Sequence, residues 1–186
     1  MHLATHLLVS WAVAGAAPLG RRDRALATLA GIVPDVDAAG LLVDLVRPAA
    51  GDPHHWYLAW HHVLAHNLTT AIAAGVIVVL LARRRWLTAG LAFLLFHVHL
   101  LGDLLGSGGP AGGVWTIRYL YPLVRSLEIG WDGQWALNAW PNVAITAAAI
   151  AMTVYLGATR GHTPIEMVSQ RTDRTIVAVI KRRIKR

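Results

Sequence analysis

Cysteine is absent from the 186 residues of this chain, which excludes disulfide bonds and thiolate metal sites. Charged residues are also scarce, at 15% of the sequence against about 25% in a typical soluble domain. Hydrophobic residues make up 55%, and the mean hydropathy is +0.48. So few charges among so many apolar residues are typical of a membrane protein, and the length suits one domain.

Acidic residues are the scarcer charged type, with 10 against 17 basic residues and a net charge of +7. The basic residues do not form a continuous patch of the kind that binds nucleic acid. They fall in short runs beside apolar segments, which is the pattern of cytoplasmic anchors in membrane proteins. We therefore expect no nucleic-acid partner, although the extreme C-terminus alone leaves that alternative open.

Apolar segments recur along the chain and predict an all-α fold, a polytopic membrane helix bundle. Residues 86–105 match the roughly 20 residues that cross a hydrocarbon core of about 30 Å. Residues 139–156 and the shorter residues 68–82 are further candidate spans. Two more apolar segments, residues 3–19 and 25–33, are short enough to span only in part.

The arginine runs predict the topology. Placing residues 21–24, residues 83–85 and the chain from Arg160 onward in the cytoplasm puts 14 of the 17 basic residues on one side. This arrangement predicts a multi-pass protein of the cytoplasmic (inner) membrane with loop 106–137 outside and the C-terminus inside. A cleaved signal peptide is the less favoured alternative, because no basic residue precedes the first apolar segment.

The C-terminal part differs from the rest in composition. We expect a membrane-embedded domain over residues 1–157, a polar linker over 158–172 and a basic tail over 173–186. The tail is apolar first and then strongly basic, as in an amphipathic helix that lies on anionic membrane lipid. A frayed basic end is the alternative.

Four groups of ionisable residues lie within or beside the apolar segments, where charges are costly and mark functional sites. The topology derived from arginines places all four groups on the outer side, although no ligand argument entered that derivation. The sequence therefore predicts a His/Asp metal site at one membrane face. The groups are His2 and His6; Asp35 and Asp37; His61, His62 and His66; and His97, His99 and Asp103.

The spacing within the groups indicates which side chains can converge. His99 and Asp103 are four residues apart and share one face of a helix. A turn after Pro34 can direct Asp35 and Asp37 at one cation, although this motif is also typical of a helix cap. Two histidines of the third group, residues 61 and 66, are five apart and converge only if a helix begins between them.

Imidazole and carboxylate ligands suit zinc, with manganese and iron as alternatives, better than magnesium or calcium. A mononuclear catalytic zinc usually takes three protein ligands, so the larger set here favours two metals within a range of one to three ions. Such sites activate water, and Asp37 or His62 is the predicted general base. The predicted metal ligands are His6, Asp35, Asp37, His61, His66, His99 and Asp103.

Other residues of these types have simpler interpretations. A histidine on an apolar helix is usually packed and hydrogen-bonded, and we expect this of His97. His54 and His55 lie in a stretch typical of a membrane interface. Asp44 and Asp52 are expected to be solvated loop charges.

The ordered motifs resemble the YdjM-type family of inner-membrane metal-dependent hydrolases, described as LexA-regulated in enterobacteria. The resemblance spans about residues 5 to 122 and implies a helical membrane hydrolase. The third motif keeps both end histidines but replaces the family's Arg, Gly and Thr, so Arg118 or Arg125 would have to contact an anionic substrate. The matching elements are Thr5-His6, Pro34-Asp35-Val36-Asp37, His61-His62-Val63-Leu64-Ala65-His66, His99-Leu100-Leu101-Gly102-Asp103, Gly106-Ser107-Gly108-Gly109 and Tyr121-Pro122.

The sequence thus predicts a membrane-bound metal-dependent hydrolase of an ester or phosphoester, small or lipid-linked. By analogy only, the His-x-x-x-Asp element also resembles zinc-dependent phospholipase C. Loop 106–137, with Trp115, is expected to cover the site. The main alternative is a non-enzymatic metal-binding or metal-transporting membrane protein. Two others are a bis-histidine haem protein, which has no use for the aspartates, and a scaffold whose tail docks partners or lipid. The oligomeric state is left open.

Overall fold

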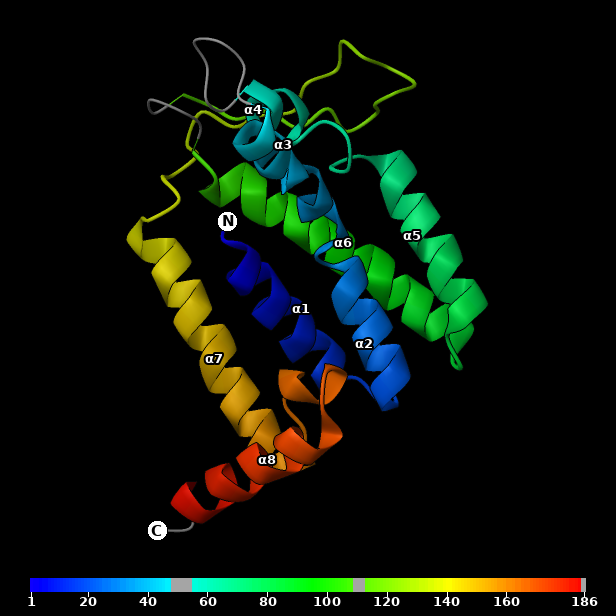
Figure 1. Ribbon diagram of the computed structural model, residues 1–186, viewed down its shortest axis with the longest axis vertical. Helices are drawn as coiled ribbons and strands as arrows, with labels where there is room; N and C mark the ends of the chain where they lie inside the picture. The colour runs from blue at the N-terminus through cyan, green and yellow to red at the C-terminus, as the bar shows by residue number, and fades with distance from the viewer. Residues whose placement is uncertain (48–54, 109–112, 185–186) are drawn as a thin grey trace.

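A computed structural model describes residues 1–47, 55–108 and 113–184, and Figure 1 shows that they fold into an all-helical protein. This confirms the predicted all-α class. Two short 3₁₀ helices, η1 (Val33–Ala39) and η3 (Pro164–Met167), accompany the α-helices. The α-helices are α1 (Leu3–Ala16), α2 (Arg21–Ala30), α3 (Gly40–Val46), α4 (His55–Trp60), α5 (Leu68–Leu81), α6 (Arg85–Gly106), α7 (Trp140–Arg160) and α8 (Gln170–Ile184).

Two helices, α6 and α7, are long and apolar enough to cross a membrane, with 22 and 21 residues. They confirm the candidate spans at residues 86–105 and 139–156. Helix α2 and the segment Val33–Val46 form a bent pair, with an angle of 54°, that counts as a third candidate if it is one span. Helices α1 and α5 have 14 residues each, which is about 21 Å of helix. They are therefore shorter than a hydrocarbon core of about 30 Å.

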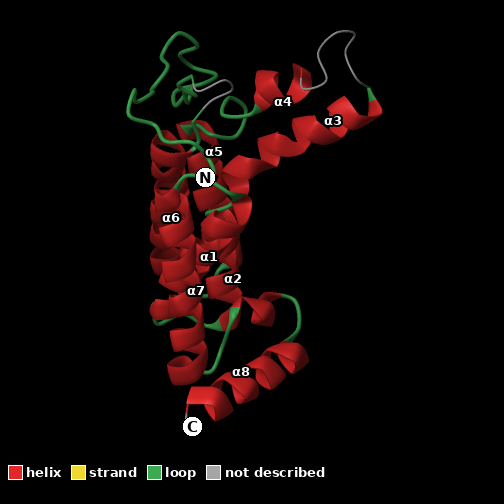
Figure 2. Ribbon diagram, turned by 90° about the vertical axis from the view of Figure 1, so that its left-hand side faces the viewer, coloured by secondary structure: helices red, strands yellow, loops and turns green. Residues whose placement is uncertain are grey.

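Helices α1, α2 and α5 run between the same two levels of the bundle. In Figures 1 and 2, α1, α2, α5, α6 and α7 lie roughly side by side, with the turns that carry the first two arginine runs at one end. At the other level α1 begins, α2 gives way to η1, and α5 begins. Three helix ends therefore meet at one depth beside α6, and this is where the predicted ligand groups lie.

Small side chains hold the bundle together. Alanine contributes to each buried apolar cluster between the helices, so the backbones approach closely, as is common in membrane bundles. A few large side chains such as Leu95 and Phe96 are also buried, but most large apolar side chains point outward, where lipid would surround them. The buried alanines include Ala14, Ala27, Ala30, Ala71 and Ala92, and the exposed residues include Ile72, Ile77, Leu80, Leu94, Val143 and Ile150.

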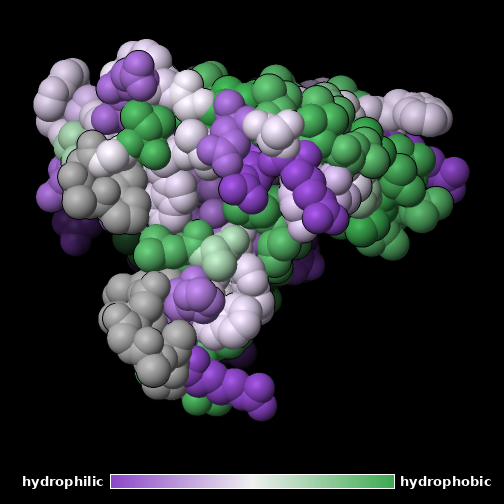
Figure 3. Space-filling view, turned by 90° about the horizontal axis from the view of Figure 1, so that it is seen from above, coloured by the Kyte–Doolittle hydropathy of each residue, from purple (hydrophilic) through white to green (hydrophobic). Residues whose placement is uncertain are grey.

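Helices α3 and α4 form an arm that stands away from the bundle (Figures 2 and 3). The carboxylate of Asp44 accepts hydrogen bonds from the backbone N–H groups of Trp56 and Tyr57, at 2.8 and 2.9 Å. Gly40 allows the two helices to touch, because a Cβ there would lie 2.7 Å from the Trp56 carbonyl oxygen. The expectation that Asp44 is a solvated loop charge is wrong: it is buried and joins the two helices of the arm.

The chain after α7 packs across the opposite end of the bundle from the arm. Glu166 in η3 accepts two hydrogen bonds from Arg24 of α2, both of 2.7 Å. Asp173, near the start of α8, accepts hydrogen bonds from the backbone and side chain of Thr163. Part of the predicted linker is therefore folded against the bundle. The division into residues 1–157, 158–172 and 173–186 stays a prediction.

The arginine-derived topology can be tested with reporter fusions. Fusions after Arg85 and after Arg186 should both report a cytoplasmic position, because basic runs are retained on that side. A fusion in the described loop residues 113–137 should report an extracytoplasmic position. A cytoplasmic reading for that loop would reverse the predicted orientation of the ligand groups.

Candidate metal centre

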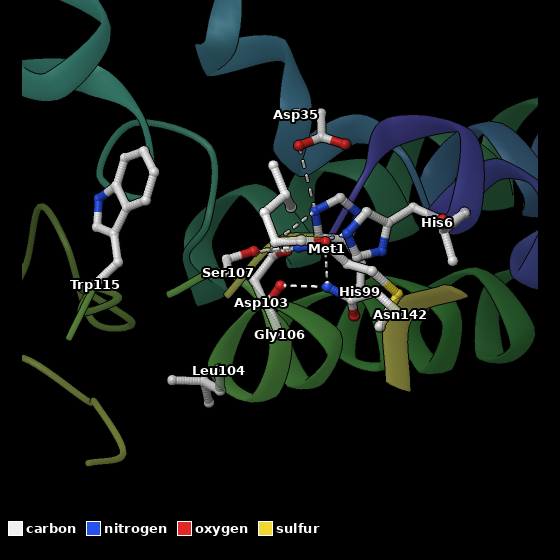
Figure 4. Close-up of polar contacts among 12 residues, drawn as sticks. Met1, His6, Asp35, His99, Asp103, Leu104, Gly106, Ser107, Trp115 and Asn142 are labelled. Atoms are coloured by element: carbon white, nitrogen blue, oxygen red, sulfur yellow. Dashed lines mark hydrogen bonds and ion pairs between the residues drawn. The ribbon is translucent and has the colours of Figure 1, made fainter. Parts of the chain in front are cut away.

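The fold brings members of all four predicted groups into one cluster. Helix α1 contributes His6, η1 contributes two aspartates, the segment between α4 and α5 contributes three histidines, and α6 contributes His99 and Asp103. Figure 4 shows several of these side chains pointing toward one another. All of them are buried except Asp35, which is partly exposed: His6, Asp35, Asp37, His61, His62, His66, His99 and Asp103.

Four ligand atoms, one from each of Asp35, His66, His99 and Asp103, lie within 4.8 Å of one another. The Asp103 Oδ2 atom is 3.0 Å from His99 Nε2 and 3.3 Å from His66 Nε2. The His99 Nε2 atom is 3.7 Å from Asp35 Oδ1. Ligand atoms at the corners of a tetrahedron with bonds of about 2.1 Å are about 3.4 Å apart. These four groups can therefore hold one zinc-sized ion with small adjustments.

A second set, His61, His62 and His66, shares one histidine with the first. These residues converge in a tight turn between the end of α4 and the start of α5, in which His62 has a φ of 66°. This left-handed conformation is uncommon for residues other than glycine. The turn, rather than a helix that begins between residues 61 and 66, produces the convergence.

Asp37 belongs to neither set, and it lies on the Nδ1 side of the His61 and His66 rings. It accepts a hydrogen bond from Nδ1 of His61 at 2.7 Å and from Nδ1 of His66 at 2.9 Å, because an ionised carboxylate can only accept. The backbone N–H of Ala65 donates to the same carboxylate. Both rings are thereby fixed with Nε2 turned to the other side, as metal-binding histidines are usually held.

His99 is oriented in the same way by a different acceptor. Its Nδ1 donates to the backbone carbonyl of Gly31 at 2.8 Å, which leaves Nε2 facing the cluster. Gly31 lies between α2 and η1, so the same turn that carries the aspartates also fixes this ring. The i, i+4 relation between His99 and Asp103 that the sequence indicates is present in the structure.

Several ligand atoms of the cluster are buried without a hydrogen-bond partner among the described residues. They are Asp35 Oδ2, both ring nitrogens of His62, and His99 Nε2. A buried polar atom without a partner destabilises the fold by about 1–3 kcal/mol, so four in one place need an explanation. A divalent cation would satisfy lone pairs on imidazole and carboxylate together, and the donor set therefore fits a metal.

The histidines of the turn differ in charge. Burial lowers the pKa of His62 well below its usual value, so this ring is neutral near pH 7. Burial also lowers the pKa of His66, but its hydrogen bonds to Asp103 and Asp37 outweigh burial and raise the pKa to about 9. An ion bound by His66 must therefore displace a proton.

The other oxygen of Asp103 has its own partners. The Oδ1 atom lies 3.0 Å from His6 Nε2 and accepts a hydrogen bond of 2.7 Å from Ser107, and the amino group of Met1 contacts it too (Figure 4). The His6 ring stacks on His99, with 3.6 Å between the ring centroids. His6 thus supports the cluster from the side of α1. Sequence reasoning did not assign Ser107 to the cluster, although its position four residues after Asp103, at the C-cap of α6, was a usable signal.

The described part of loop 106–137 covers the cluster, as the sequence predicts. Trp115 packs against His61 and His62, with ring centroids 5.0 and 4.6 Å apart. Gln134 holds this cover in place, because its side chain accepts from the Trp115 N–H and donates to the Asp103 carbonyl.

The remaining predicted residues lie apart from the cluster. His97 donates to the carbonyl of Phe93 and bonds to the hydroxyl of Tyr119, on another face of α6. Arg118, one of the two candidates for contact with an anionic substrate, forms an ion pair of 2.9 Å with Glu128. His54 and Asp52 lie outside the described residues.

The chain matches no protein-family model, no curated protein and no solved structure. The resemblance to the YdjM-type family stays a prediction that rests on the ordered motifs. What the structure establishes is a helical protein with two or three candidate membrane spans and a buried His/Asp cluster that can hold a metal ion.

Proposed function

We propose that this protein is a multi-pass protein of the inner membrane that binds a divalent metal near its outer face and hydrolyses an ester or phosphoester. The observation that carries the proposal is the group of unpartnered ligand atoms on Asp35, His62 and His99 around the Asp103 carboxylate. Neutral packing would leave these atoms unsatisfied, whereas one metal ion would use the lone pairs of Asp35 and His99.

The two ligand sets are unequal. The set of Asp35, His66, His99 and Asp103 offers two carboxylates and two imidazoles, and we assign the firmly bound ion to it. One imidazole nitrogen binds one ion, and the Nδ1 atom of His66 is held by Asp37. A second ion at His61 and His62 therefore needs a further ligand, and the Asp37 carboxylate, which is hydrogen-bonded to His61, is the candidate.

The metal would supply a Lewis acid that activates water and stabilises the charge that develops on the substrate. Imidazole and carboxylate ligands favour zinc, with manganese and iron as alternatives. His62 is the better placed of the two predicted general bases, because it is neutral and its nitrogens have no hydrogen-bond partner among the described residues. Asp37 is already engaged with two histidines.

A substrate with an acyl chain fits the position of the cluster. A cavity of about 310 Å³ between α2 and α5 is lined almost entirely by apolar side chains, including Leu26, Leu29 and Ile77. It reaches Val33, two residues before Asp35. This proximity in η1 supports a lipid or lipid-linked ester, with its chain in the cavity and its polar group at the metal.

A metal-binding or metal-transporting protein without enzymatic activity would use the same cluster. Transport also needs a polar path from the cluster to the arginine end of the bundle. Between these levels the described helices meet through an apolar cluster that includes Ala14, Ala27 and Leu95, which disfavours such a path. A haem is disfavoured as well, because the His66 and His99 rings touch each other with no room for a macrocycle between them.

A matched pair of histidines on α6 tests the site. His99→Gln removes a ligand nitrogen and should lower both the zinc content, measured by elemental analysis, and the hydrolysis of a generic phosphoester. The rate should fall by roughly 100-fold or more if the metal activates the attacking water. His97→Gln, two residues away on the same helix, should change neither quantity.

Asp103→Asn should reproduce the His99→Gln result, and the double variant should lose little more, because residues that act as one unit are not additive. Equal losses of zinc and activity in the His97 and His99 variants would show that His99 has no specific role at a metal site. Full activity in protein stripped of metal would overturn the mechanism. Normal metal binding in protein that cleaves no ester would favour the non-enzymatic alternative.

Asp37→Asn tests whether this residue orients the ligands or binds metal. Loss of an outer carboxylate that fixes metal-binding histidines typically weakens metal affinity by about 10- to 100-fold. We expect a loss of this size in a chelator competition assay, with Asp132→Asn in the exposed part of the loop as the control. A larger loss, together with fewer ions bound, would make Asp37 a ligand, as the sequence predicts. An unchanged affinity would contradict both roles.

A further inference from the structure

A second charged site lies at the end of the bundle opposite the metal cluster. The turn between α1 and α2 and the turn between α5 and α6 meet there around a cavity of about 320 Å³ (Figure 1). We call it the arginine cavity, and its lining residues are Gly20, Arg21, Arg22, Asp23, Arg83 and Arg84.

Two of the four arginines are fixed by the protein. Arg21 donates from Nε to the backbone carbonyl of Glu166 at 2.6 Å, and Arg84 donates to the carbonyl of Pro18 at 2.9 Å. A neutral carbonyl acceptor holds a guanidinium in position without cancelling its charge. The positive charges of these two side chains therefore remain available to a ligand.

The other two arginines, Arg22 and Arg83, are exposed, and no hydrogen bond from either side chain reaches the described residues. The nearby acidic groups are committed elsewhere. Asp23 is buried and accepts hydrogen bonds from the backbone N–H groups of Arg83 and Arg84, both of 2.9 Å. Glu166 is paired with Arg24. Four arginines against one lining carboxylate leave the cavity strongly positive.

The backbone adds to this charge. Helix α2 begins in the wall of the cavity, and its N-cap residue, Gly20, has no side chain to cap the first turn. Unpaired N–H groups and the positive end of the helix dipole favour an anion at such a position. Helix, cavity and arginines therefore select the same kind of ligand, one with negatively charged oxygens.

We propose that the arginine cavity binds a phosphate group, with Arg22 and Arg83 closing on it from two different turns. Guanidinium groups match phosphate oxygens by paired hydrogen bonds. The phosphate can come from the headgroup of an anionic phospholipid in the adjacent leaflet or from free phosphate in solution. Either source would join the α1–α2 turn to the α5–α6 turn, and this site is independent of the proposed hydrolase activity.

The test uses the full-length protein in vesicles of phosphatidylcholine with increasing phosphatidylglycerol, and bound lipid is counted by native mass spectrometry. Arg22→Gln/Arg83→Gln should weaken phosphatidylglycerol binding by about 25-fold, if each arginine contributes about fivefold. The matched control is Arg85→Gln/Arg171→Gln, which removes the same charge at the same end from two exposed arginines outside the cavity lining and outside the predicted lipid-binding tail. Unfolding temperatures of both variants show whether they fold.

A parallel arm replaces phosphatidylglycerol with inorganic phosphate. Loss of phosphatidylglycerol binding in the cavity variant but not in the Arg85→Gln/Arg171→Gln control supports the site and assigns a lipid source. Loss of phosphate binding, without selectivity for phosphatidylglycerol over phosphatidylcholine, supports the site with free phosphate as its ligand. Equal losses in the two double variants would overturn the proposal, since general attraction to charge would then explain the binding. So would wild-type binding of both probes by the folded cavity variant.

Discussion

The carboxylate of Asp103 is the point at which the separate parts of this chain are joined. It is buried among apolar helices, where an ionised group without partners would destabilise the fold by several kcal/mol. One of its oxygens faces His6 and Ser107, and the other faces His66 and His99. Its partners come from α1, the turn before α5, and α6 itself. The charge is therefore stable only when these elements are assembled, so that folding and the formation of the ligand cluster are one event.

Residue spacing was sufficient to predict the part of the site that lies on one helix. His99 and Asp103 are four residues apart on a long apolar helix, and an α-helix places residues at this spacing on the same face. The orienting position of Asp37 could not be predicted in this way. Its partners His61 and His66 reach it through the fold, and a Pro-Asp-x-Asp motif looks the same whether its second carboxylate faces a cation or the back of two imidazoles.

Features that depend on contacts between distant segments were also beyond the sequence. Asp44 resembles a loop charge until α4 folds back and presents two N–H groups to it. The left-handed backbone at His62 has no signal in the residues around it, because glycine or asparagine would be the usual choice there. Composition predicted the helical class and two long spans for a simpler reason: burial in lipid restricts such segments to helices with internally paired backbones.

Helix α2 ends and helix α5 begins at the level where the buried charged residues of the cluster lie. Irregular backbone at membrane depth is tolerated only where protein buries it or where it lines a cavity, and the turns that carry Asp35 and His66 lie against α6 and beneath the loop that carries Trp115. In the proposed membrane position, α2 and α5 can therefore stop short of a full span, because Gly31 after α2 and Asn67 before α5 are buried in protein. At the opposite end the first two arginine runs lie instead, and neither of the candidate metal-binding groups found among the described residues is there. The bundle is thus chemically asymmetric, with the His/Asp cluster at one level and the arginine runs at the other. Apolar contacts between small side chains separate the two levels, so each end can bind its own ligand without sharing a polar path.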